Sequence, residues 1–183
     1  MAKNSIFTVA YRRKREGKTN YKKRLTLLKS NLTRLVIRKT NTEIVLQLVN
    51  YDQDGDKVVA TVPSKKLIKF GWDYSKKSIP AAYLTGLLLA KMAKTKNVTE
   101  AVLDLGLQTP EQKSKVYAAL KGAIDGGLNI PADEKVFPDE SRIKGEHISK
   151  MSDLPLFSKY KSKKLDVTKM PTVFEAVKKK IME

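Results

Sequence analysis

The residues with the clearest capacity for binding chemistry lie in one short segment, residues 12–24. Eight of its thirteen residues are basic and only Glu16 is acidic. Cations at this density repel one another, and they are stabilised beside a polyanion such as nucleic acid, which presents a negative phosphate every few ångströms. The segment, called the basic run below, is therefore predicted to bind phosphate groups.

Catalytic or metal-binding patterns of similar strength are absent from the sequence. Residues 52–56 (DQDGD) alternate carboxylates around a glycine as calcium loops do, but Pro63 stands where such a loop needs a glutamate, so a hairpin turn is predicted. His147 is the only histidine and cannot form a His-based metal cluster. Gly126 and Gly127 do not match a phosphate-binding loop. We therefore expect no enzymatic activity, no cofactor and no metal site.

Charge is concentrated at the two ends of the chain. The net charge is +18, and residues 1–40 hold 13 basic and 1 acidic residues. Residues 41–141 hold 13 of each sign, whereas residues 142–183 hold 11 basic and 5 acidic residues. A neutral folded middle with basic extensions is predicted.

Length and composition suit a soluble protein with one core. The 183 residues are 41% hydrophobic and include no cysteine, which excludes disulfides, thiolate nucleophiles and Cys-ligated zinc. The first six residues lack the apolar run of a signal peptide. The most apolar segment, residues 79–90, falls short of the roughly 20 residues that span a bilayer. A cytoplasmic location is expected.

Hydrophobic periodicity predicts an α/β fold. In the first strand, from Thr33, Leu35 and Ile37 face one way and Arg34, Val36 and Arg38 face the other. Residues 43–51 and 57–62 continue an antiparallel meander. A helix capped by Ser78 follows, with Ala81, Leu84, Leu88 and Met92 on its core face, then a strand at 98–105, a helix from Thr109 and a strand at 128–131. We expect a mixed sheet with helices on one face and the other face open.

Both extensions are predicted to carry a helix. The basic run is expected to be extended first and helical after a cap at Thr19 or Asn20, with an apolar seam of Tyr21, Leu25 and Leu28. The chain beyond Pro131 is expected to wrap the surface, with a terminal helix at 172–181. The predicted organisation is an arm at 1–31, a core at 32–131 and an extension at 132–183.

Two groups outside the basic run have open interpretations. Trp72 and Tyr74 lie in a lysine-rich loop that ends at Lys76 and Lys77, so their rings either stack on bases or pack in the core. Arg34 and Arg38 are either solvated charges or RNA contacts on the open face of the sheet.

Several blocks of sequence resemble the archaeal form of the universal large-subunit ribosomal protein that binds 5S rRNA. The blocks are RRKREGKTNY (12–21), FGW (70–72), IPAAYLTGLL (79–88), DLGL (104–107) and AALKGAIDGGLNIP (118–131). The resemblance implies a mixed α/β core that binds 5S rRNA in the central protuberance. The implied partners are 5S rRNA, large-subunit rRNA, the other 5S rRNA-binding ribosomal protein and neighbouring large-subunit proteins, with no membrane.

Residues expected to contact RNA come from the basic run, the first strand and the aromatic loop. They are Arg12, Arg13, Lys14, Arg15, Lys18, Thr19, Asn20, Tyr21, Lys22, Lys23, Arg24, Arg34, Arg38, Trp72, Tyr74, Lys76 and Lys77.

Two other functions are compatible with a basic arm. The chain could be an adaptor for another structured RNA or an anionic surface, although the arm lacks the broad apolar face of a membrane-surface helix. An RNA-modifying enzyme would need a nucleophile, metal cluster or nucleotide loop that the sequence does not show. With so little apolar surface, the arm is expected to be disordered without RNA.

Overall fold

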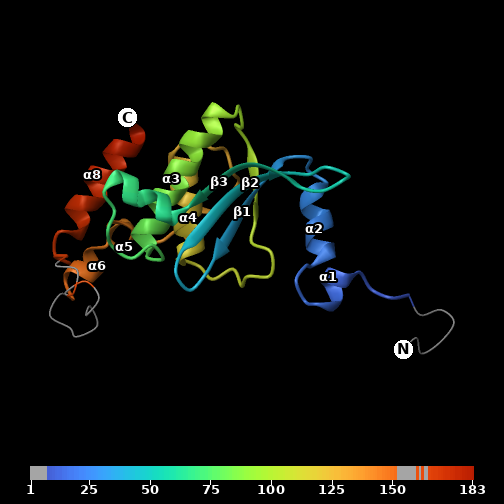
Figure 1. The fold of residues 1–183 in the computed structure, drawn as a ribbon, viewed down its shortest axis with the longest axis horizontal. Coiled ribbons are helices and arrows are strands. Elements are labelled where there is room, and N and C mark those ends of the chain that lie inside the picture. Colours follow the sequence, from blue (N-terminus) through green and yellow to red (C-terminus); the bar gives the residue numbers. More distant parts are fainter. Residues whose placement is uncertain (1–7, 152–159, 161, 163–164) are drawn as a thin grey trace.

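The computed structural model describes residues 8–151, 160, 162 and 165–183. The start of the predicted arm (1–7) and the segment around Pro155 in the predicted extension lie outside these residues. The described chain has a mixed four-stranded sheet with helices packed against it, which confirms the predicted α/β class. The basic run and the C-terminal helix lie at opposite ends of the molecule (Figure 1).

The sheet is an antiparallel meander extended by one parallel strand. Strands β1 (Thr33–Lys39), β2 (Ile44–Asn50) and β3 (Lys57–Pro63) form the meander, with residues 52–56 in its second turn as predicted. Strand β4 (Ala101–Asp104) pairs in parallel with β1, so the strand order is β3-β2-β1-β4. The predicted strand at 128–131 is reduced to one bridge between Asn129 and Glu100.

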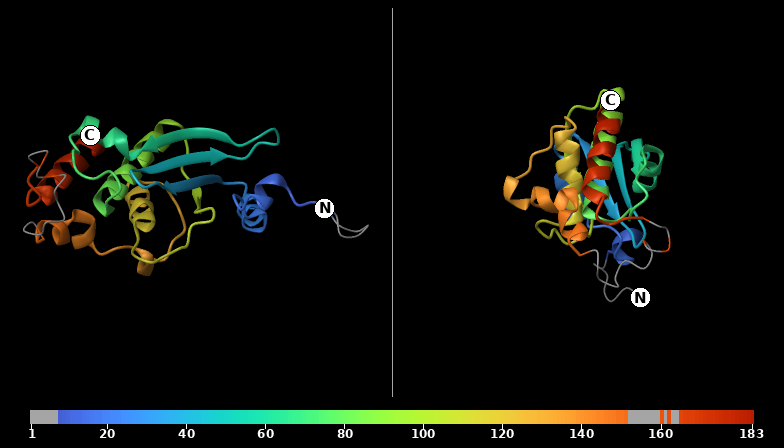
Figure 2. Two further views of the ribbon diagram at one scale, coloured as in Figure 1. Left: turned by 60° about the horizontal axis from the view of Figure 1, so that its bottom comes forward. Right: turned by 90° about the vertical axis from the view of Figure 1, so that its left-hand side faces the viewer.

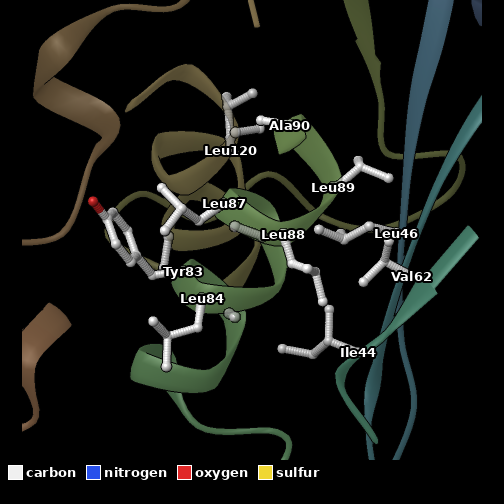
Figure 3. Packing of buried hydrophobic residues seen from close by; sticks show 14 of the residues in the cluster. Ile44, Leu46, Val62, Tyr83, Leu84, Leu87, Leu88, Leu89, Ala90 and Leu120 are labelled. Atoms are coloured by element: carbon white, nitrogen blue, oxygen red, sulfur yellow. The ribbon is translucent and has the colours of Figure 1, made fainter. Parts of the chain in front are cut away.

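One face of the sheet is covered by helix α3 (Ile79–Thr95), which connects β3 to β4. Among its leucines, Leu88 and Leu89 lie on the side of Ile44, Leu46 and Val62 on the strands (Figure 3). The expected cap at Ser78 is confirmed, since its hydroxyl accepts a hydrogen bond from the Ala81 N–H at 3.3 Å. The helix is buried on more than the single predicted face because further helices cover the side away from the sheet.

Helix α4 (Lys115–Asp125) covers the far side of α3 and begins later than predicted. The capping-box pattern at Thr109 does not start it, because Lys113 has a φ of 55° and donates its N–H to the Val136 carbonyl. These contacts delay the helix until after Ser114. Its predicted end at Gly126 and Gly127 is confirmed, with Gly127 at a φ of 98°.

The C-terminal part of the chain contributes to the same core. The 3-10 turn η1 (Ser64–Phe70) lies earlier, between β3 and α3. After α4 come the 3-10 turn η2 (Glu134–Val136) and the short helices α5 (Glu140–Lys144) and α6 (Glu146–Ser149), which lead towards α8 (Met170–Met182). The predicted terminal helix is thus confirmed, and it lies beside α3 (Figure 2). Met170, Phe174, Val177 and Ile181 are buried, so α8 does more than wrap the surface.

Two glycines set the distance between α3 and α4. A Cβ atom added at Gly86 would overlap the Ala119 carbonyl oxygen, and one added at Gly122 would overlap the Tyr83 carbonyl oxygen. Both clashes are with backbone atoms of the facing helix, which cannot rotate away. The crossing therefore requires a residue without a side chain at each position.

Replacing Gly86 by alanine should destabilise the fold by about 2–3 kcal/mol, because overpacking against backbone outweighs the gain in helix propensity. Urea unfolding of Gly86→Ala and Gly122→Ala would measure this loss. Lys91→Ala, on the exposed side of α3, is the matched control and should change the free energy of unfolding by less than about 0.5 kcal/mol. Equal stability of Gly86→Ala and Lys91→Ala would contradict the close crossing.

Candidate nucleic-acid interface

The basic run folds into two short helices. Helix α1 (Arg12–Arg15) and helix α2 (Tyr21–Leu28) are joined by a turn in which Gly17 has a φ of 63°. The cap at Asn20 is confirmed, because its side-chain oxygen accepts a hydrogen bond from the Lys23 N–H at 3.1 Å. The expectation that the first half is extended is wrong. That part is helical, and an ion pair of 2.8 Å between Arg12 and Glu16 spans it.

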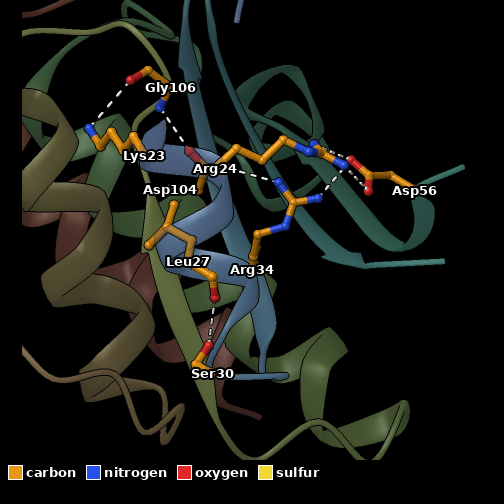
Figure 4. Close-up of polar contacts among 8 residues, drawn as sticks. All are labelled: Lys23, Arg24, Leu27, Ser30, Arg34, Asp56, Asp104 and Gly106. Atoms are coloured by element: carbon orange, nitrogen blue, oxygen red, sulfur yellow. Dashed lines mark hydrogen bonds and ion pairs between the residues drawn. The ribbon is translucent and has the colours of Figure 1, made fainter. Parts of the chain in front are cut away.

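Polar contacts, more than an apolar seam, join α2 to the rest of the protein. Helix α2 has no buried residue, and Leu25 of the predicted seam is 61% exposed. Arg24 binds both carboxylate oxygens of Asp56, at 2.7 and 2.8 Å (Figure 4). Lys23 Nζ donates to the Gly106 carbonyl at 3.3 Å. The helix is therefore held to the β2–β3 turn and to the loop after β4.

Asp56 also binds an arginine from the sheet. Arg34 of β1 donates to Asp56 Oδ2 at 2.6 Å and to Asp104 Oδ2 at 2.9 Å. The second oxygen of Asp104 accepts the Gly106 N–H at 2.9 Å. We call Arg24, Asp56, Arg34 and Asp104 the arm latch (Figure 4). It holds two positive and two negative charges and connects the arm, the hairpin and two strands.

The latch corrects the role predicted for Arg34. Its side chain is only 3% exposed and its guanidinium is bound by two carboxylates, so it is not available to a phosphate in this structure. It serves instead as a bridge inside the protein. The Arg24 and Arg34 guanidiniums also lower the pKa of Asp56, with the Arg24 hydrogen bond the larger cause.

A hollow of about 760 Å³ lies between the arm and the open face of the sheet. It brings together nine of the predicted residues: Arg13, Lys18, Thr19, Asn20, Tyr21, Lys23, Arg24, Arg34 and Arg38. Among the polar side chains that also line it are Gln47, Asp56, Asp104 and Gln108, which the sequence analysis missed. Strand alternation could have indicated Gln47, which lies opposite Val36 on the open face, but the other three follow from tertiary contacts alone.

The cations of the arm and of β1, of which only some line the hollow, differ in their availability. Arg12 and Lys18 pair with Glu16, and Arg13 Nε donates to the Thr19 hydroxyl at 2.9 Å. By contrast, the exposed cations that form no ion pair with any residue that the structure describes include Lys14, Arg15, Lys22 and Arg38. These four side chains can meet phosphates without first breaking an internal contact.

The aromatic loop lies outside the hollow. The Trp72 side chain is fully buried, its indole N–H donates to the Ser75 carbonyl at 3.2 Å, and its ring packs on that of Tyr74. Tyr74 is buried too, with its hydroxyl donating to the Asp166 carbonyl at 2.6 Å. The two rings therefore pack in the core, and their burial leaves no ring face exposed for base stacking. Lys76 and Lys77 are at least partly exposed, but they do not line the hollow.

Comparison with known proteins shows the family of the chain. The sequence matches the model of a family described as "Ribosomal large subunit proteins 60S L5, and 50S L18" over residues 5–99 and 91–133. The chain belongs to this family. It is also 48% identical over 153 residues to the large ribosomal subunit protein uL18 of Korarchaeum cryptofilum (strain OPF8), an alignment that covers 84% of this chain and 78% of that protein.

Family membership makes the chain a structural, non-enzymatic component of the large ribosomal subunit, with ribosomal RNA and ribosomal proteins as its partners. It confirms the predicted archaeal type of large-subunit protein and its place in the cytoplasm with the ribosome. Within the described part of the chain, every helix is too short or too polar to cross a membrane.

Lowering the pH should release the arm only below the ordinary titration range of an aspartate. The pKa of Asp56 is lowered in the folded protein, so its stabilisation is complete above the unfolded pKa of about 3.9 and is lost as the pH falls through the folded value. Amide chemical shifts of residues 21–28, followed by NMR from about pH 6 to pH 2, would report the release.

The Asp56→Asn variant provides the control. Asparagine does not titrate, so the chemical shifts of its arm should lack the transition that Asp56 causes. Release of the wild-type arm with a midpoint above about pH 5 would contradict the latch geometry.

Proposed function

We propose that this protein binds 5S rRNA in the hollow between its basic arm and the open face of its sheet. By holding 5S rRNA and large-subunit rRNA together, it helps to anchor the 5S rRNA in the central protuberance, beside the other 5S rRNA-binding ribosomal protein. The observation that carries the proposal is the hollow itself, with unpaired cations along its arm and the open strand face as its floor.

The composition of the hollow suits folded RNA. Helical RNA hides its base edges in a deep, narrow groove, so proteins recognise it by shape, phosphates and 2′-hydroxyls, or through unpaired loops. Arg38 in the lining of the hollow, and Lys14, Arg15 and Lys22 on the arm outside that lining, supply cations for phosphates. Side-chain amides from Asn20, Gln47 and Gln108 supply hydrogen-bonding groups for sugars and bases.

The concave shape also discriminates against the alternative of an anionic membrane surface. A membrane-surface segment needs a broad apolar face, whereas the apolar seam of α2 is narrow and the helix has no buried residue. A hollow whose lining includes Arg13, Lys18 and Arg38 fits a curved, folded polyanion better than a flat lipid surface.

Removing free arm cations should flatten the salt dependence of 5S rRNA binding. In the double variant Lys14→Gln/Arg15→Gln, the slope of log affinity against log salt should fall in magnitude by about 1.4–1.8, since each phosphate contact contributes about 0.7–0.9. Filter binding to an archaeal 5S rRNA over a range of salt concentrations would measure the slope.

The matched control removes the same charge at the opposite end of the molecule. Lys179→Gln/Lys180→Gln lies on α8, far from the arm, and should leave the slope nearly unchanged (Figure 1). Equal slopes for the two double variants would exclude the arm from the interface. Equal affinity of the wild type for 5S rRNA and for a plain duplex of the same length would contradict selective 5S rRNA binding.

A further inference from the structure

We propose that Asp56 is a positioning residue that holds the basic arm over the sheet before RNA arrives. The proposal extends the proposed function, because it explains how a segment dense in cations can form one wall of a binding hollow. It also replaces the expectation that the arm is disordered without RNA.

The arm has little else to hold it in place. Neither α1 nor α2 has a buried residue, and Tyr11 and Leu25 are 72% and 61% exposed. The four consecutive cations of α1 repel one another. The strongest contact between α2 and the body of the protein is therefore the one between Arg24 and Asp56, supported by the Lys23 contact to the Gly106 carbonyl.

Asp56 is well suited to this task by its geometry. Its two oxygens match the two outer nitrogens of Arg24, an arrangement that fixes orientation as well as distance. Oδ2 also accepts a hydrogen bond from Arg34, which is anchored in turn by Asp104. Arg34 is buried and held by the sheet. Because Asp56 binds both Arg34 and Arg24, it fixes the position of the arm relative to the sheet. The Asp56 side chain is 27% exposed, so water only partly screens these contacts.

Loss of the carboxylate would do more than remove an attraction. Asp56 lies between two guanidiniums, those of Arg24 and Arg34, and its charge is what allows them to approach the same group. Without that charge the two cations would repel each other directly. Since Arg34 is buried in the sheet, Arg24 would be displaced, and the arm with it.

The proposal predicts a change in RNA affinity opposite in sign to that expected from net charge. Removing an acidic residue beside an RNA site makes the protein more positive, which by charge alone strengthens binding to a polyanion. If Asp56 positions the arm, its loss instead weakens binding, because RNA must first order a displaced arm. An arm in the correct position only about one tenth of the time would bind about tenfold more weakly.

The test compares Asp56→Asn with Asp54→Asn in the full-length protein. Both variants lose one negative charge from the same turn, but Asp54 forms no ion pair with a described residue and does not line the hollow. In the RNA-free protein, amides of residues 21–28 should exchange with solvent faster in Asp56→Asn alone, while amides of α3 stay protected. Affinity for 5S rRNA should fall about tenfold in Asp56→Asn and stay equal or rise in Asp54→Asn.

A second variant guards against a general loss of structure. Arg24→Lys keeps the charge of the arm and all of Asp56, but a lysine cannot bind the carboxylate with two parallel hydrogen bonds. Amide exchange of residues 21–28 should become faster in Arg24→Lys while the contacts of Arg34 remain. If Asp56→Asn is unfolded as a whole, the exchange rates of Arg24→Lys decide whether the latch holds the arm.

The outcomes separate this inference from the proposed function. Wild-type exchange rates in residues 21–28 of both Asp56→Asn and Arg24→Lys would overturn the latch, whatever the RNA results. Equal or tighter RNA binding by Asp56→Asn relative to Asp54→Asn would overturn the positioning role. If the wild type fails to bind 5S rRNA, the proposed function fails, and the exchange experiment still decides whether Asp56 holds the arm.

Discussion

The close crossing of α3 and α4 determines where the rest of the structure can lie. At Gly86 and Gly122 each helix backbone contacts the other with no side chain between them. The pair can therefore stack as a thick layer on one face of the sheet, with α8 beside α3. The remaining face of the meander receives no helix from this layer. That face becomes the floor of the hollow, so packing in the core creates the surface on which the proposed function depends.

The availability of each basic side chain in this protein depends on its ion-pair partners as well as on its place in the sequence. The basic run appears uniform in the sequence, yet its cations have different roles once the chain folds. Arg24 is bound by Asp56, and Arg12 and Lys18 by Glu16, whereas Lys14 and Arg15 extend into solvent without an ion pair among the described residues. The internal carboxylates reduce repulsion near the core and leave free charge on the outer part of the arm, where a polyanion would approach.

Predictions from local pattern agreed with the structure where local forces dominate. The alternation in β1 to β3, the caps at Asn20 and Ser78 and the glycine end of α4 depend on residues a few positions apart. The predicted start of α4 was wrong because the Lys113 N–H donates a hydrogen bond to the Val136 carbonyl, which lies outside the capping motif. Of the two interpretations of Trp72, the structure shows core packing, because folding places the lysine-rich loop against the core. Arg34 is not a solvated charge on the open face, because two carboxylates that are distant in the sequence bind its buried guanidinium.

The sequence by itself determined the strands of the meander and the presence of α2, α3, α4 and α8, which face of the meander is apolar, and that positive charge gathers at the ends. These properties follow from side-chain spacing and composition, which need no knowledge of distant contacts. Only the tertiary structure decided which cations are free and how the arm is held. Arg24 meets Asp56 across 32 positions of sequence, and Arg34 meets Asp104 across 70. Such pairs form because the sheet and its turns bring them together, and no local pattern encodes that distance.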